Sequence, residues 1–310
     1  MQLSLFDLHC DTPYEMHRKQ QGLTQNTLAV SLERARVFGQ YVQVMAHWTD
    51  HMLDDEPGWN RFLAMRRHLD ADTAIQDGTA RIVTRYDGAT TSSATLILAL
   101  EDARILAGKI ERVNALYDAG IRIVTPLWKG ETCIGGSHDV QSGLTSFGKT
   151  ALFRAVSLGM ILDISHASER SASEIFELSS EQGRPVIASH SNAYTVCPVS
   201  RNLRDEQIKG ILLSGGVIGL NLYGHFLRPD GAALAKDVLP HAEHFLSMGA
   251  EDALCLGCDM DGCDLPPDLT NISMLPRLAE EMLRHNYPEK LIHKIFFENA
   301  SRFAKKYFQF

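Results

Sequence analysis

The chain has 310 residues, of which 45% are hydrophobic and 22% are charged, and this composition is typical of a folded protein rather than a disordered or fibrous one. The net charge of −8 is spread along the chain without a basic block, which argues against a nucleic-acid partner. No apolar run approaches the ~18 residues of a membrane-spanning helix, and the first residues lack the basic start of a signal peptide. We therefore expect a cytoplasmic protein without a membrane partner.

Short apolar, β-branched runs alternate with longer helical patterns along the whole chain. Near-continuous apolar strands separated by helices indicate a parallel sheet that is covered on both faces. No repeat or linker divides the chain, so eight such units predict an α/β fold, a TIM-type (β/α)8 barrel of the metal-dependent hydrolase type, in a single domain over residues 1–310. The predicted strands cover residues 3–8, 41–46, 95–100, 121–127, 160–164, 185–189, 217–223 and 253–257.

Helix signals fill the segments between these strands. Ser168 is expected to cap a helix that ends at residue 179, and Asp102 to begin one that ends at residue 119. Residues 61–80 are expected to form a surface helix. An open doubly wound sheet is the alternative, but the glycines of residues 215–219 precede a strand, whereas a phosphate-binding loop follows one.

Histidines and carboxylates follow five of the eight predicted strands. In such barrels the reacting groups lie at the C-terminal ends of the strands. His9 and Asp11 also point the same way along a strand, so the pair could chelate one ion. Each residue alone has an ordinary structural explanation, but the joint placement at strand ends of one polarity predicts a metal site. The candidates are His9, Asp11, Glu101, Asp102, His166, His190, Asp259 and Asp261.

The other histidines have weaker claims to a functional role. His47 and His225 follow predicted strands and are second-tier candidates for the barrel mouth. His138 lies on a glycine-rich loop and is expected to be an ordinary loop residue. The remaining histidines, His241 among them, lie in helical or polar stretches and are expected to be solvated.

At these residues the sequence resembles the membrane (renal-type) dipeptidase family of zinc metallopeptidases, and its unanchored bacterial members most of all. The resemblance covers nearly the whole chain. Its most specific parts are the segments around His166 and around His190. The motifs are DLHCDTP at 7–13, GLTSFG at 143–148, LGMILDISHAS at 158–168, PVIASHSN at 185–192, CPVSRNL at 197–203, GCDMDG at 257–262 and ENASRF at 298–303.

The resemblance implies a TIM barrel that binds two zinc ions per chain. His9 and Asp11 would hold one ion, and His166 and His190 would hold the other. Glu101 would bridge the two ions and so belong to the catalytic machinery as well. The family also suggests a homodimer.

The resemblance further implies how a dipeptide substrate is held and cleaved. Arg201 would bind the free carboxylate, Asp259 would transfer the proton, and Tyr223 would lie near the substrate pocket. One position departs from the renal-type pattern, because Trp128 stands where those enzymes have a substrate-binding histidine. An indole N–H can donate one hydrogen bond but cannot accept one or titrate. Carbonyl polarisation would then rest more on zinc, and the acyl-group preference could change.

These roles predict a zinc-dependent dipeptidase in which a metal-bridging hydroxide attacks the peptide carbonyl. Two alternatives stay open. One is another two-metal barrel amidohydrolase, such as a lactonase or a deaminase, although those enzymes usually open with His-x-His rather than His-x-Asp. The other is a non-catalytic zinc- or ligand-binding barrel, which would have no need of both Asp259 and Arg201.

Overall fold

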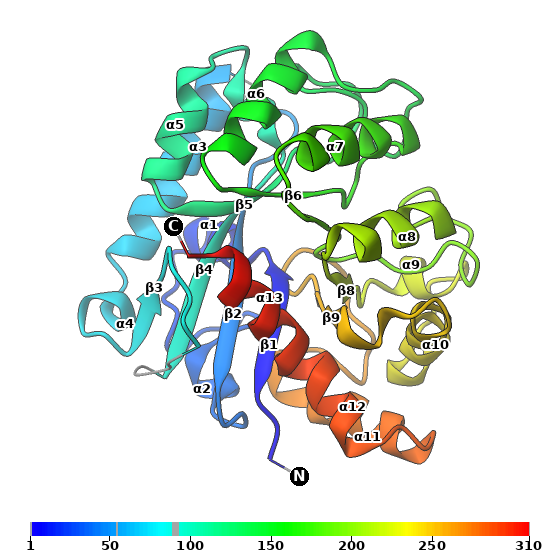
Figure 1. Cartoon of the computed structure of the whole chain (residues 1–310). Coiled ribbons are helices and arrows are strands. Elements are labelled where there is room, and N and C mark those ends of the chain that lie inside the picture. The colour runs from blue at the N-terminus through cyan, green and yellow to red at the C-terminus, as the bar shows by residue number, and fades with distance from the viewer. Residues whose placement is uncertain (1, 54, 89–92, 310) are drawn as a thin grey trace.

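Parallel strands form the centre of the computed structural model, which describes residues 2–53, 55–88 and 93–309 (Figure 1). Eight of them are hydrogen-bonded in the order β7-β6-β5-β4-β2-β1-β9-β8. The sequence predicted all eight. Their bounds are β1 Leu5–Cys10, β2 Tyr41–Trp48, β4 Ala94–Glu101, β5 Ile121–Thr125, β6 Ile161–Asp163, β7 Val186–Ile187, β8 Ile218–Leu220 and β9 Leu254–Leu256.

The two ends of this sheet meet through backbone contacts between the residue that follows β7 and the start of β8. Ala188 forms a parallel bridge with Ile218, and the Ala188 amide donates a 3.0 Å hydrogen bond to the Val217 carbonyl oxygen. The approach is close enough to require glycine, because a Cβ atom at Gly219 or Gly257 would overlap the Ser189 carbonyl oxygen. The sheet therefore closes into the TIM-type barrel that the sequence predicts.

Helices surround the barrel, as Figure 1 shows. The α-helices are α1 Thr12–Lys19, α2 Leu32–Ala35, α3 Asp55–Asp70, α4 Thr73–Gln76, α5 Glu111–Asp118, α6 Ser146–Ser157, α7 Glu169–Glu181, α8 Asp205–Ser214, α9 Gly224–Leu227, α10 Leu239–Ser247, α11 Pro276–Arg284, α12 Glu289–His293 and α13 Asn299–Tyr307. Shorter helical turns are η1 Ala103–Leu106, η2 Ala235–Val238, η3 Ala250–Asp252 and η4 Ile272–Met274, and the π-helical η5 Lys294–Glu298 joins α12 to α13.

Two predicted helices differ from the structure. The predicted helix over 61–80 is wrong in its second half, because Asp72 ends it: its carboxylate accepts hydrogen bonds from the Leu23 and Ala74 amides and begins α4 instead. Residue 80 then starts a short strand, β3 (Ala80–Ile82), which pairs with β4 outside the barrel. The helix predicted over 102–119 is interrupted by the left-handed backbone of Ala107, so it splits into η1 and α5. Ser168 caps α7 as predicted.

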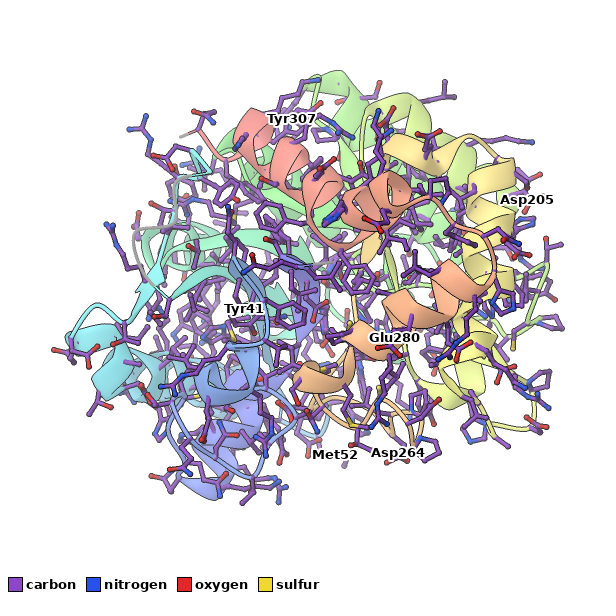
Figure 2. All side chains as sticks on the ribbon, turned by 90° about the horizontal axis from the view of Figure 1, so that it is seen from below. Tyr41, Met52, Asp205, Asp264, Glu280 and Tyr307 are labelled. Carbon is purple, nitrogen blue, oxygen red and sulfur yellow. The ribbon has the colours of Figure 1, made fainter. Side chains whose placement is uncertain are left out.

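Helix α13 covers one end of the barrel and leaves the other end open. Its side chains Ala300, Phe303 and Ala304 pack in one apolar cluster with inward residues of the strands, such as Phe6 and Val44. Figure 2 shows Tyr307 of α13 at the opposite edge of the molecule from Met52 and Asp264, which lie in loops after β2 and β9. The core thus fills the N-terminal end of the barrel and leaves the strand carboxyl ends for a site. Among the described residues, no helix is long and apolar enough to cross a membrane.

Candidate metal centre

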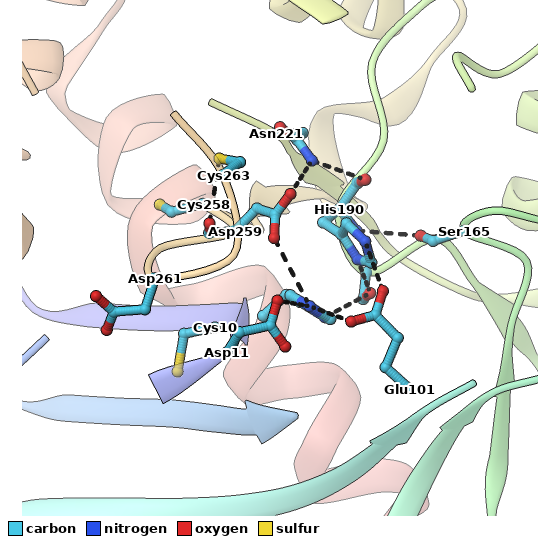
Figure 3. A network of polar contacts seen from close by, with 12 residues as sticks. Cys10, Asp11, Glu101, Ser165, His190, Asn221, Cys258, Asp259, Asp261 and Cys263 are labelled. Atoms are coloured by element: carbon cyan, nitrogen blue, oxygen red, sulfur yellow. Dashed lines mark hydrogen bonds and ion pairs between the residues drawn. The ribbon is translucent and has the colours of Figure 1, made fainter. Parts of the chain in front are cut away.

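The five predicted metal ligands converge at the carboxyl ends of the strands. Asp11, Glu101 and His190 point toward a common space in Figure 3. His9 lies where β1 changes register against β2, between Asp7 and Cys10, and such irregularities are common beside active sites because they re-aim a side chain. Two of the histidines follow closely on short strands: His166 comes just after β6, and His190 just after β7.

Glu101 occupies the middle of this group, and its two carboxylate oxygens face different histidines. Oε2 lies 3.3 Å from His9 Nε2, whereas Oε1 lies 3.2 Å from His166 Nε2 and 3.4 Å from His190 Nε2. The Nε2 atoms of His166 and His190 are 3.0 Å apart. The Glu101 carboxylate thus lies between one imidazole nitrogen on one side and two on the other.

The side of the centre around His9 carries two further carboxylates. The Oδ2 atom of Asp11 and the Oδ1 atom of Asp259 each lie 3.9 Å from His9 Nε2. His9 Nε2 and Asp11 Oδ1 are buried and accept or donate no hydrogen bond among the described residues. Unpartnered buried polar atoms of this kind are costly unless something else satisfies them. Imidazole nitrogens and carboxylate oxygens suit a divalent metal such as zinc, so these residues fit a metal pair.

The electrostatics of the centre favour the binding of cations. Burial raises the pKa of the Glu101 carboxyl to about 8 and that of Asp259 to about 6. Burial also lowers the pKa of His166 and His190 well below the usual value. For His9, burial works against protonation, but Glu101 and Asp11 raise its pKa. Bound cations would stabilise the carboxylates and the neutral imidazoles together.

Comparison of the sequence with known protein families gives one match over nearly the whole chain. The family model of membrane dipeptidase, peptidase family M19, matches residues 1–309. The chain belongs to the membrane dipeptidase family. Its members are metallopeptidases, so this protein is a hydrolase of peptide bonds with a metal-binding centre.

Two solved structures of metallopeptidases are similar to this chain over nearly its whole length. A metallopeptidase from Rhodobacter sphaeroides, solved with a phosphinate mimic of the dipeptide L-Ala-D-Ala, is 26% identical, with a TM-score of 0.88 over 99% of this chain and 100% of that one. A second M19 metallopeptidase, dipeptidase AC, is 26% identical with a TM-score of 0.91 over 99% of both chains. An uncharacterised Klebsiella pneumoniae protein from the pqqA 5′ region is 31% identical over 69% of this chain and 82% of its own length.

A cavity of about 460 Å³ opens onto the metal centre of this dipeptidase family member. Trp128 and Tyr223, both predicted to contact substrate, line it together with Phe226. Trp128 has a second role that the sequence did not indicate, because its carbonyl oxygen lies 3.2 Å from His166 Nδ1. A proton held on Nδ1 by that carbonyl leaves the Nε2 lone pair facing Glu101.

Arg201 is 4% exposed and lines a separate, smaller pocket with His138 and Ser200 rather than the cavity over the metal centre. Its Nη1 donates a 2.7 Å hydrogen bond to Ser191 Oγ, and its Nη2 donates to the His190 carbonyl oxygen. The guanidinium lies 5.4 Å from the ring centre of Phe226, while its Nε–H has no partner among the described residues. Burial lowers the pKa of Arg201 to about 10, so the side chain stays charged at neutral pH.

Asp259 is held in place through its side chain and its backbone. Asn221 Nδ2 donates a 3.1 Å hydrogen bond to the Asp259 Oδ2 atom, and the Asp259 backbone has a left-handed φ of 59°. The neighbouring Gly262 is required because a Cβ atom there would overlap the Asp11 and Asp259 carboxylates. Strained backbone of this kind is common where a fold fixes a functional group.

The remaining strand-end candidates lie outside the centre. Asp102 binds Arg104 and begins η1. Asp261 accepts 2.7 Å hydrogen bonds from Thr12 Oγ1 and the Ala29 amide, so it anchors the loop beside the site. His47 is fully buried against Phe62 instead of lining the mouth.

His241 corrects another expectation, because it is fully buried rather than solvated. It lies on α10, and its ring bridges two other segments of the chain. Nδ1 accepts from the Ala193 amide at 3.1 Å, and Nε2 lies 3.1 Å from the Leu227 carbonyl oxygen.

Proposed function

We propose that this protein is a zinc-dependent dipeptidase that cleaves dipeptides with a free C-terminal carboxylate. The position of Glu101 between His9 on one side and His166 and His190 on the other carries the proposal, because it matches a two-metal hydrolytic centre. The relative solved with a dipeptide mimic supports the same substrate class. A cytoplasmic location and a homodimer stay predictions.

The two ions would be held as the sequence predicts. His9 and Asp11 would bind one zinc ion, His166 and His190 would bind the other, and Glu101 would bridge them. Such a pair, when bound, supplies Lewis acidity toward a carbonyl oxygen and makes a water molecule acidic near neutral pH.

Asp259 would move the proton in this reaction. Its Oδ1 faces the His9 side of the centre, and Asn221 holds Oδ2, so one oxygen stays free to accept a proton from water and deliver it to the leaving amine.

Arg201, Trp128 and Tyr223 would position the substrate. A guanidinium fork matches a carboxylate in shape and charge, and Arg201 offers an Nε–H without a partner among the described residues. The carboxylate of a dipeptide lies at a fixed distance from its scissile bond, so this arrangement selects short substrates. Trp128 and Tyr223 would hold the remaining part of the dipeptide and exclude water.

Hydrolysis of dipeptides before and after chelation tests this function. We expect turnover that chelation abolishes and added Zn²⁺ restores, with about two zinc ions per chain. A simple lactone and a purine nucleoside serve as controls for the two barrel alternatives. Turnover of either control without dipeptide hydrolysis would contradict the proposal, as would zinc binding with no hydrolysis of any of them.

A further inference from the structure

Asp163, at the end of β6, is a fully buried carboxylate that lies behind the metal centre. It collects donors from the ends of three neighbouring strands. The backbone amides of Ser165 and Ser189 each donate a 2.9 Å hydrogen bond to Oδ1, and Thr125 Oγ1 donates a 2.6 Å bond to Oδ2. The Ser189 hydroxyl donates to the same Oδ2 atom. Asp163 thus accepts four hydrogen bonds, and one of them comes from the Ser189 hydroxyl.

The lone pairs of the Ser189 hydroxyl oxygen face two histidines. A serine hydroxyl has one proton to donate and two lone pairs to accept with. With its O–H directed at the Asp163 carboxylate, Ser189 has lone pairs left to accept hydrogen bonds. Its oxygen lies 2.6 Å from His190 Nδ1 and 3.5 Å from His9 Nδ1. The two imidazole rings stack with their centres 3.7 Å apart, so one oxygen reaches both.

We infer that Ser189, oriented by Asp163, is a positioning residue that fixes the tautomers of His9 and His190 together. Each ring then carries its proton on Nδ1 and presents the Nε2 lone pair to the centre. These histidines belong to different halves of the proposed zinc pair, so a single hydroxyl tunes both halves. The inference rests on the proposed metal centre. It predicts that substitution of Ser189 weakens the binding of both metal ions, although the residue ligates neither.

Ser189→Ala tests this directly. Loss of a partner of this kind typically costs about 10–100-fold in metal affinity, and we expect that loss at both zinc sites in competition titrations with a chelator. Ser165→Ala is the matched control, because Ser165 is an equally buried serine whose hydroxyl contacts Ser191 Oγ and the His190 amide but no imidazole. Thermal unfolding of the metal-free proteins checks that both variants fold.

Asp163→Asn gives a second test that keeps the shape of the side chain. An amide N–H₂ facing Ser189 would donate to its oxygen, and the serine proton would then turn toward an imidazole nitrogen. We expect zinc affinity to fall at least as far as in Ser189→Ala. In zinc-loaded wild type, ¹⁵N-edited spectra of the histidine rings should show slowly exchanging Nδ1–H protons on His9 and His190, and both variants should lose them.

The outcomes separate this inference from the proposed function. If the wild type binds no zinc, the proposed function fails. If the wild type binds two zinc ions and Ser189→Ala binds them with unchanged affinity and an unchanged histidine spectrum, the inference is overturned. An equal loss of affinity in Ser165→Ala would also overturn it, because the effect would then reflect general packing.

Discussion

The Nη2 atom of Arg201 donates a 2.9 Å hydrogen bond to the carbonyl oxygen of His190. This bond joins the proposed carboxylate-binding side chain to the backbone of a proposed metal ligand. A substrate carboxylate on Arg201 would therefore lie at a fixed distance from the metal centre, and small displacements of the guanidinium would misplace the scissile bond.

Arg201→Lys should not be a conservative change. Lysine has a point charge without the planar fork, and it cannot keep the bonds to Ser191 and His190 while holding a carboxylate. Losing a charge-assisted hydrogen bond costs about 1.5–3 kcal/mol, which corresponds to roughly a 10- to 150-fold fall in kcat/KM.

The control for Arg201→Lys is the C-terminally amidated form of the same dipeptide. The amide should be a poor substrate for the wild type and should lose little more in the variant. Measuring kcat/KM for acid and amide on both proteins completes a double-mutant-type cycle. Equal losses for the two substrates would rule out carboxylate binding by Arg201.

Asp259→Asn should lower kcat by about 10²–10⁴-fold, the usual contribution of a general acid–base group. Metal content should stay at the wild-type value, because the proposed role of Asp259 is proton transfer and not ligation. Steady-state kinetics and elemental analysis on the same preparation measure both. Loss of zinc in this variant would instead make Asp259 a ligand, which its 3.9 Å separation from His9 Nε2 allows geometrically.

Glu101→Gln should weaken both metal sites at once. The amide keeps the shape of the side chain but removes the negative charge that faces His9 on one side and His166 and His190 on the other. We expect elemental analysis after dialysis to find well under two zinc ions per chain, with hydrolysis reduced in proportion. Full occupancy would contradict the bridging role.

His241 lies outside the metal centre, and its titration makes the free energy of unfolding depend on pH. Burial lowers the pKa of its imidazole to about 4, whereas an unfolded chain has a histidine pKa near 6.5. The unfolded state therefore binds more protons between these values, so the free energy of unfolding falls as the pH drops from about 6.5 to about 4. At about 1.4 kcal/mol per pKa unit, the loss from this residue is about 3 kcal/mol at the acid end.

His241→Gln isolates that contribution, because a glutamine amide can also accept from Ala193 and donate to Leu227 without titrating. Urea unfolding at about pH 7.5 and at about pH 5, on either side of the unfolded-state pKa, should show wild type losing more stability than the variant. Parallel losses in the two proteins would mean that His241 is not the titrating group.

The order of strands and helices and the polarity of the barrel follow from the amino-acid sequence alone. Apolar β-branched runs separated by helical patterns allow few arrangements, and a parallel barrel places every strand carboxyl end at one mouth. For that reason the sequence is enough to group His9, Asp11, Glu101, His166 and His190, although these residues are far apart in the chain.

Folding in three dimensions determines which strand-end side chains face the centre and what holds them. Asp102 and Asp261 follow strands as Glu101 and Asp259 do, but their carboxylates are taken up by Arg104 and Thr12. Side-chain direction after a strand depends on local backbone torsion and on distant partners, and neither has a pattern in the sequence. The bonds from Asp163 through Ser189 to His9 and His190 span up to 180 residues of chain, so only the folded chain brings these groups together.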